Sequence, residues 1–191
     1  KKYKRCGKMW WFEYGPLKLK PTIKPSAGLG VSVHRILENH VDKGDEIPDT
    51  KPGRIAATAL DKIKDHNELI AEQNITIPLT ENSDILCRLD LMGKNSAYIG
   101  DYKTTSNFKW AKTRAELRKD VQMLTYSYAG YHAALVEGCS VIAKPETVDL
   151  EWIYLRTTGL PVSMSVANYA DWSDIENNWI SIGKIADEMG P

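Results

Sequence analysis

Apolar and polar residues in the middle of the chain are arranged in a way that predicts two β-strands joined by a tight polar turn. Apolar, β-branched and aromatic residues fill positions 85–92 and 97–102, and glycine, lysine, asparagine and serine stand between them. Side chains alternate faces along a strand, so Asp101 and Lys103 share one face. An even-numbered hairpin loop places Asp90 on that face too, whereas an odd loop or a bulge would move it away.

The patterns around this hairpin predict an α/β protein. A helical period of apolar residues predicts helices, and two-residue alternation predicts strands. The expected helices cover residues 26–41, 54–71, 120–137 and 171–189, and the expected strands cover residues 71–79 and 147–155. Together with the hairpin they predict a central mixed β-sheet of four or five strands flanked by helices on both faces.

Length and composition favour one soluble intracellular domain. The 191 residues, 42% of them hydrophobic, suffice for one well-cored domain that covers residues 1–191. No apolar run approaches the roughly 20 residues that span a bilayer, and no signal peptide opens the sequence, so we expect no membrane partner. Three scattered cysteines, Cys6, Cys87 and Cys139, favour a reducing compartment over a disulfide framework.

The charge is balanced in total but uneven along the chain. The formal net charge of zero argues against a protein that coats nucleic acid by charge alone. Residues 1–33 hold eight basic groups against Glu13, and residues 146–191 hold eight acidic groups against two basic ones. This asymmetry suits a polyanion held on one side, and an ordinary solvated surface is the alternative.

Two segments combine cations with aromatic rings. Residues 1–15 contain five aromatics, which either bind single strands or pack on the core, and residues 104–119 follow the hairpin directly. We expect the cationic stretches at residues 1–24 and 108–119 to flank a cleft and to form a passage for a single strand.

The charges on the hairpin favour a divalent metal. The Asp90 and Asp101 carboxylates repel each other at close range, and Lys103 offers one positive charge against two negative ones. A metal ion would balance the remaining negative charge. A solvated hairpin with a salt bridge is the alternative reading of the spacing.

The order of several motifs resembles that of a nuclease superfamily. Asp90 followed by Asp101-Tyr102-Lys103 resembles the D…(D/E)xK core of the PD-(D/E)xK nucleases, and Arg-Leu-Asp-Leu with Ile-Gly-Asp-Tyr-Lys-Thr is similar to its RecB-type exonuclease branch. That branch also carries a histidine on an upstream helix. His34 matches it.

A Gln-x-x-x-Tyr motif downstream of the core is matched by Gln122 and Tyr126. Each pattern alone is common, and this last pair could be an ordinary helix surface. In the family's order the patterns become specific, and the resemblance covers residues from about 3 to 155. It implies a restriction-endonuclease-like core.

The resemblance also implies a ligand set. Asp90 and Asp101 would bind Mg²⁺ or Mn²⁺, the backbone carbonyl of Tyr102 would be a third ligand, and His34 would be an imidazole ligand that makes Mn²⁺ as acceptable as Mg²⁺. Some relatives hold an iron–sulfur cluster through four cysteines. Cys6 stands where the first of these cysteines would be, but no group of three cysteines follows the core. We therefore expect no iron–sulfur cluster.

Other residues would support the chemistry. Lys103 would orient or deprotonate the attacking water. In the family, the glutamine and tyrosine that Gln122 and Tyr126 match contact the substrate backbone and orient the lysine. Glu72 matches a glutamate that begins the family's first strand, although it could equally be a surface residue. Glu38, one helical turn after His34, has no motif support.

The resulting hypothesis is a metal-dependent DNA exonuclease that prefers single-stranded ends and acts in recombination, repair or phage DNA processing. Such a protein would be cytoplasmic, in a bacterial or phage-infected cell, with a helicase or recombinase as a candidate partner. The alternatives are a structure-specific or restriction-type endonuclease, a non-catalytic DNA-binding subunit of a helicase–nuclease, and a domain unrelated to nucleic acids.

Overall fold

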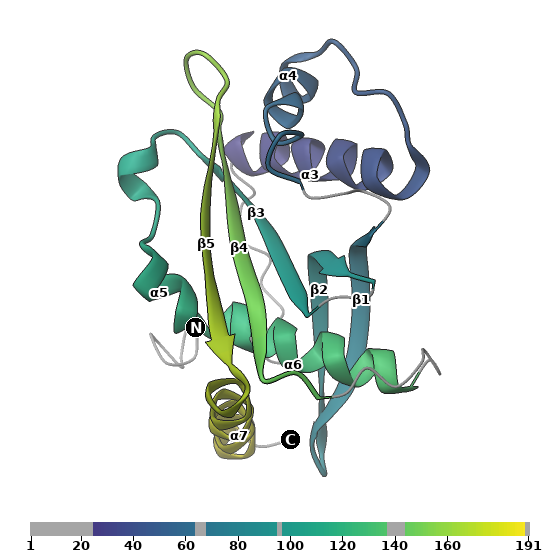
Figure 1. Cartoon of the computed structure of the whole chain (residues 1–191), viewed down its shortest axis with the longest axis vertical. Helices are drawn as coiled ribbons and strands as arrows, with labels where there is room; N and C mark the ends of the chain where they lie inside the picture. The colour runs from purple at the N-terminus through teal and green to yellow at the C-terminus, as the bar shows by residue number, and fades with distance from the viewer. Residues whose placement is uncertain (1–24, 64–67, 95–96, 137–143, 190–191) are drawn as a thin grey trace.

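A mixed β-sheet forms the centre of the computed structural model, which describes residues 25–63, 68–94, 97–136 and 144–189 (Figure 1). Its five strands follow one another in the order β1-β2-β3-β4-β5. The strands are β1 (Leu69–Thr80), β2 (Ser83–Gly93), β3 (Tyr98–Thr105), β4 (Thr147–Arg156) and β5 (Ser163–Asp171). Only β3 and β4 pair in parallel, and the other neighbours are antiparallel.

Helices cover both faces of this sheet, as the sequence predicted. The helices are α3 (Pro25–Lys43), α4 (Lys51–Ala57), the 3-10 turn η2 (Phe108–Trp110), α5 (Arg114–Arg118), α6 (Val121–Val136) and α7 (Trp172–Met189). The apolar residues of α3 and α4 pack in one core cluster, and those of α5, α6 and α7 pack in another. The crossover from β3 to β4 carries η2, α5 and α6, because parallel strands need a long connection.

β4 shows why two cores are needed. Trp152 and Tyr154 face the cluster under α6, whereas Ile153 and Leu155 face the cluster under α3. All four side chains are buried. A strand that is apolar on both faces belongs in the interior of the sheet, and β4 accordingly lies between β3 and β5.

The β1–β2 hairpin crosses from one core to the other. Ala71 packs under α3, but Ile75, four residues later, packs under α6, and Leu91 and Leu89 make the same change on β2. Strict alternation would place each of these pairs on a single face. The change falls where Glu72, a candidate site residue, adopts a φ of +49°.

Two predictions of secondary structure need correction. The helix expected over residues 54–71 is wrong, because α4 ends at Ala57 and β1 begins at Leu69. Thr58 caps α4, and its hydroxyl donates to the Ile55 carbonyl at 2.7 Å. The apolar residues at helical spacing, such as Ala59 and Ile63, are buried in the turns that follow. The edge strand β5 was not predicted.

In the described ranges no helix combines the length and the apolar character that crossing a membrane requires. The aromatic and basic segment at residues 1–24 lies outside the described residues, as do Cys6 and Cys139.

Candidate metal centre

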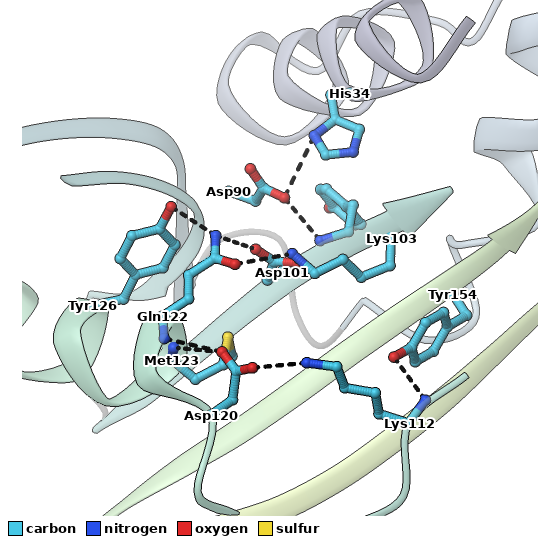
Figure 2. A network of polar contacts seen from close by, with 11 residues as sticks. His34, Asp90, Asp101, Lys103, Lys112, Asp120, Gln122, Met123, Tyr126 and Tyr154 are labelled. Atoms are coloured by element: carbon cyan, nitrogen blue, oxygen red, sulfur yellow. Dashed lines mark hydrogen bonds and ion pairs between the residues drawn. The ribbon is translucent and has the colours of Figure 1, made fainter. Parts of the chain in front are cut away.

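Three side chains from one helix and two neighbouring strands converge on one point. His34 comes from α3, Glu72 from β1 and Asp90 from β2, and their ligand atoms all lie within 4.8 Å of one another. His34 Nδ1 lies 3.4 Å from Asp90 Oδ2, and Figure 2 shows the imidazole directed at this carboxylate. Two carboxylates and an imidazole form a donor set that suits a divalent metal ion.

Asp90 occupies a gap between two strands. β2 and β3 pair through Leu91↔Gly100 and Met92↔Ile99, a register that places Asp90 opposite Asp101 one step further on. Ladder pairing ends there. Asp90 Oδ2 instead accepts the backbone N–H of Tyr102 at 2.8 Å. The carboxylate therefore takes the place of a missing strand partner, which fixes its position.

Glu72 is held in a conformation that side chains disfavour. Its φ of +49° is the only positive value among the described non-glycine residues. Such a backbone costs about 1–3 kcal/mol and is concentrated at functional sites. The Glu72 side chain is only 7% exposed and pairs with Arg88. Burial raises the pKa of Glu72; the Arg88 cation opposes this shift and the Asp90 charge adds to it.

His34 lies in a strongly negative environment. Burial favours its neutral form, but the hydrogen bond and charge of Asp90, assisted by Asp101 and Glu72, outweigh this and raise the pKa of His34. The ring also meets Tyr102 edge to face, with centroids 5.6 Å apart. Three carboxylates thus act on one imidazole, and this excess of negative charge would stabilise a bound cation.

A second network adjoins these ligands and contains four predicted site residues. Lys103 pairs with Asp101 Oδ2, and its Nζ donates to Gln122 Oε1 at 3.4 Å. Gln122 Nε2 donates to Asp101 Oδ1 at 3.3 Å and to the Tyr126 hydroxyl at 2.9 Å. Figure 2 shows this chain of contacts beside Asp90. Gln122 therefore holds Lys103 and Asp101 in one arrangement.

Asp101 is outside the group of three converging ligands. Asp101 is only 2% exposed. One of its carboxylate oxygens pairs with Lys103 and the other accepts from Gln122. Burial raises the pKa of Asp101 to about 6; the Lys103 cation opposes the shift and the Asp90 charge adds to it. The structure thus brings His34, Glu72 and Asp90 together and places Asp101 next to Lys103. The predicted ligand role of Asp101 stays a prediction, as does that of the Tyr102 carbonyl.

An open cleft of about 410 Å³ gives access to the three ligands. The side chains of α3, β1, β2 and α6 line it: Gly30, Val31, His34, Arg35, Glu38, Glu72, Arg88, Asp90 and Tyr126. Tyr126 therefore connects the cleft to the Lys103 network. Burial raises the pKa of Tyr126 to about 12, so its hydroxyl remains a neutral donor at ordinary pH.

Two residues at or near the site, Arg88 and Asp120, were not predicted to have a role there, and Lys112 was expected only as part of the cationic segment at residues 108–119. Arg88 pairs with Glu72, and its place two residues before Asp90 in a strand was the signal for a shared face. Asp120 accepts from the backbone N–H groups of Gln122 and Met123, and Lys112 donates to its other oxygen at 2.9 Å. An aspartate two residues before Gln122 at the start of a helix was the signal for an N-cap.

Neither a scan against protein-family models nor a search of curated proteins found a match for this chain.

Proposed function

We propose that this protein is a metal-dependent nuclease with a PD-(D/E)xK core, a DNA exonuclease that prefers single-stranded ends. One observation carries the proposal. Imidazole and carboxylate ligand atoms from three separate elements converge within 4.8 Å in an open cleft, beside a lysine paired with a buried aspartate. Hydrolysis of a phosphodiester needs these components: a site for a cation, and a nearby group that handles a proton and balances negative charge.

The donor set fits Mg²⁺ or Mn²⁺. Hard divalent cations prefer carboxylate oxygens, and an imidazole makes Mn²⁺ acceptable. His34, Glu72 and Asp90 would hold the ion. When bound, it would supply polarisation of the phosphate and activation of water.

Lys103 has the position and the accessibility for a catalytic role. Its side chain is 32% exposed, so a substrate can reach it, and its ammonium is fixed by Asp101 and Gln122. It can orient an attacking water and offset charge on the scissile phosphate. Gln122 and Tyr126 keep this lysine in place, and the Tyr126 hydroxyl can donate to a substrate oxygen in the cleft.

The deciding experiment uses end-labelled single- and double-stranded DNA, linear and circular, with Mg²⁺, Mn²⁺ or EDTA. We expect digestion of linear single strands with either metal, resistance of circles and no cleavage in EDTA. Asp101→Asn should abolish cleavage but retain DNA affinity, because it keeps the shape of the side chain and reduces repulsion of phosphate.

Rapid nicking of circular single strands would replace the exonuclease with the endonuclease alternative. Absence of cleavage of every substrate with both metals would contradict the proposal. An Asp101→Asn protein that cuts at a tenth or more of the wild-type rate would remove the Asp101–Lys103 pair from the mechanism.

A further inference from the structure

Trp110 is an exposed aromatic five residues beyond the end of β3, the strand that carries Asp101 and Lys103. It closes η2, seven residues after Lys103, and 69% of its surface is exposed. Burying such a ring would contribute about 1.5–3 kcal/mol or more, and the fold leaves this contribution unused. Lys109 Nζ lies 5.0 Å from the ring centroid. A cation and an open aromatic surface are thus held side by side.

The residues around Trp110 are strongly basic. Residues 109–119 contain five basic side chains and one acidic side chain, Glu116. Glu116 is occupied by the capping box of α5. Lys112 and Arg118 form ion pairs, but Lys109, Arg114 and Lys119 form none with the described residues, and all three are exposed. Unpaired cations of this kind attract a polyanion.

This segment is tied directly to the candidate site. Lys112 donates to Asp120, Asp120 accepts the backbone N–H of Gln122, and Gln122 donates to Asp101. Figure 2 shows the whole chain of contacts in one view. At the other side of the cleft, Gly30 of α3 approaches the Thr104 hydroxyl so closely that an added Cβ would lie 2.9 Å from it. Thr104 near the end of β3 therefore lies against α3, and η2 with Trp110 begins four residues later.

We propose that residues 109–119 form a binding surface for single-stranded nucleic acid, with Trp110 as the stacking platform and Lys109, Arg114 and Lys119 as phosphate ligands. The inference rests on the proposed function and names the part of the substrate that it would hold outside the cleft. Every base has a flat π-face, so stacking needs no particular sequence. A duplex hides these faces inside its stack, so the surface selects single strands. An acidic peptide offers the negative charges but not the rings, which makes it the weaker candidate.

The test separates stacking from charge by using two strands of equal charge. Fluorescence anisotropy in EDTA measures the affinity for a 12-nucleotide oligothymidylate and for an abasic strand of the same length. Trp110→Ala should lower the affinity for oligothymidylate by roughly ten- to a hundredfold and should leave that for the abasic strand within about twofold. Lys109→Gln should lower the affinity for both strands and reduce the salt dependence of binding by about one counterion.

Matched controls lie on α7. Ile180→Ala removes a side chain of an exposed residue there, and Lys184→Gln removes an exposed charge; neither should change binding. Equal affinity of wild-type protein and Trp110→Ala for oligothymidylate would overturn the inference. Trp110-dependent binding of polyglutamate without binding of oligothymidylate would overturn it in favour of an acidic partner.

The two proposals fail in different ways. Cleavage of linear strands together with unchanged binding by Trp110→Ala would refute this surface and leave the nuclease intact. Binding that depends on Trp110, without cleavage in any metal, would support the surface and refute the nuclease.

Discussion

Glu72 combines a strained backbone with a carboxylate that has little access to water. Its φ of +49° has a conformational cost, and its side chain is 7% exposed. A buried carboxylate needs a cation, and Arg88 supplies one in the structure. A metal ion at the candidate centre would supply another. Arg88 and a metal therefore compete for the same negative charge.

Substitution of Arg88 tests this competition. Arg88→Ala leaves the Glu72 carboxylate without its partner, so the metal-free protein should lose about 1 kcal/mol or more of stability, a fall of roughly 2–4 °C in Tm. Mn²⁺ should then raise the Tm of Arg88→Ala by more than it raises that of the wild type. Thermal unfolding with EDTA and with Mn²⁺ measures both.

Arg54→Ala is the control for this comparison, because it breaks the exposed ion pair between Arg54 and Asp49. It should leave both Tm values nearly unchanged. Equal stabilisation of wild-type and Arg88→Ala protein by Mn²⁺ would show that Glu72 is not part of a metal site.

At the scale of elements, the first turn of α6 determines where Gln122 lies. Asp120 Oδ1 accepts from the N–H groups of Gln122 at 3.0 Å and Met123 at 3.3 Å, and its other oxygen binds Lys112. An N-cap of this type contributes about 0.5–2 kcal/mol. Because Gln122 holds Lys103 and Asp101, the cap also positions the catalytic lysine of the proposal.

Asp120→Ala should therefore lower kcat by about tenfold or more, reduce stability by about 1–2 kcal/mol and leave the Mn²⁺ affinity unchanged. Asp120→Asn keeps an acceptor for the helix N-terminus and should recover most of kcat and stability, although it lacks the charge that pairs with Lys112. Steady-state kinetics and chemical denaturation of the two variants decide this. A wild-type kcat for Asp120→Ala would remove α6 from the mechanism.

The sequence predicted best the elements whose pattern is strong. The apolar period of residues 26–41 and the alternation of residues 147–155 appear as α3 and β4. β5 was missed because its alternation is short and because Ala167, Asn168 and Ala170 have low β propensity. The helix expected over residues 54–71 failed because buried turns and the start of β1 continue the same apolar spacing.

The candidate site was predicted in its residues but not in its grouping. The order of motifs identified His34, Asp90, Asp101 and Lys103. Glu72 joins Asp90 because the flanking pairs Ala71↔Leu91 and Gln73↔Leu89 place the two residues opposite each other, whereas Asp101 is tied to Lys103. The register between two strands depends on tertiary packing, and no local pattern encodes it.

At the scale of the whole molecule, different strands of the sheet carry the two groups of site residues. β1, β2 and α3 present the three converging ligands, and β3 with α6 presents Lys103, Asp101 and Gln122. The cleft exposes the three ligands and Tyr126, whose hydroxyl accepts from Gln122 of the second group. The basic segment with Trp110 follows β3 along the chain. In the proposed function a single strand of nucleic acid would lie along residues 109–119 and the cleft, with one phosphate beside His34, Glu72 and Asp90.

The central claim is that His34, Glu72 and Asp90 bind one divalent cation. The most direct measurement is a titration with Mn²⁺ followed by electron paramagnetic resonance, which detects the loss of free Mn²⁺ without any substrate. The account predicts a site in the wild-type protein that weakens by a factor of roughly ten to a hundred in Asp90→Asn. Asp84→Asn, the same change at an exposed position of β2, should bind like the wild type. Equal Mn²⁺ binding by the wild type, Asp90→Asn and Asp84→Asn would contradict the account.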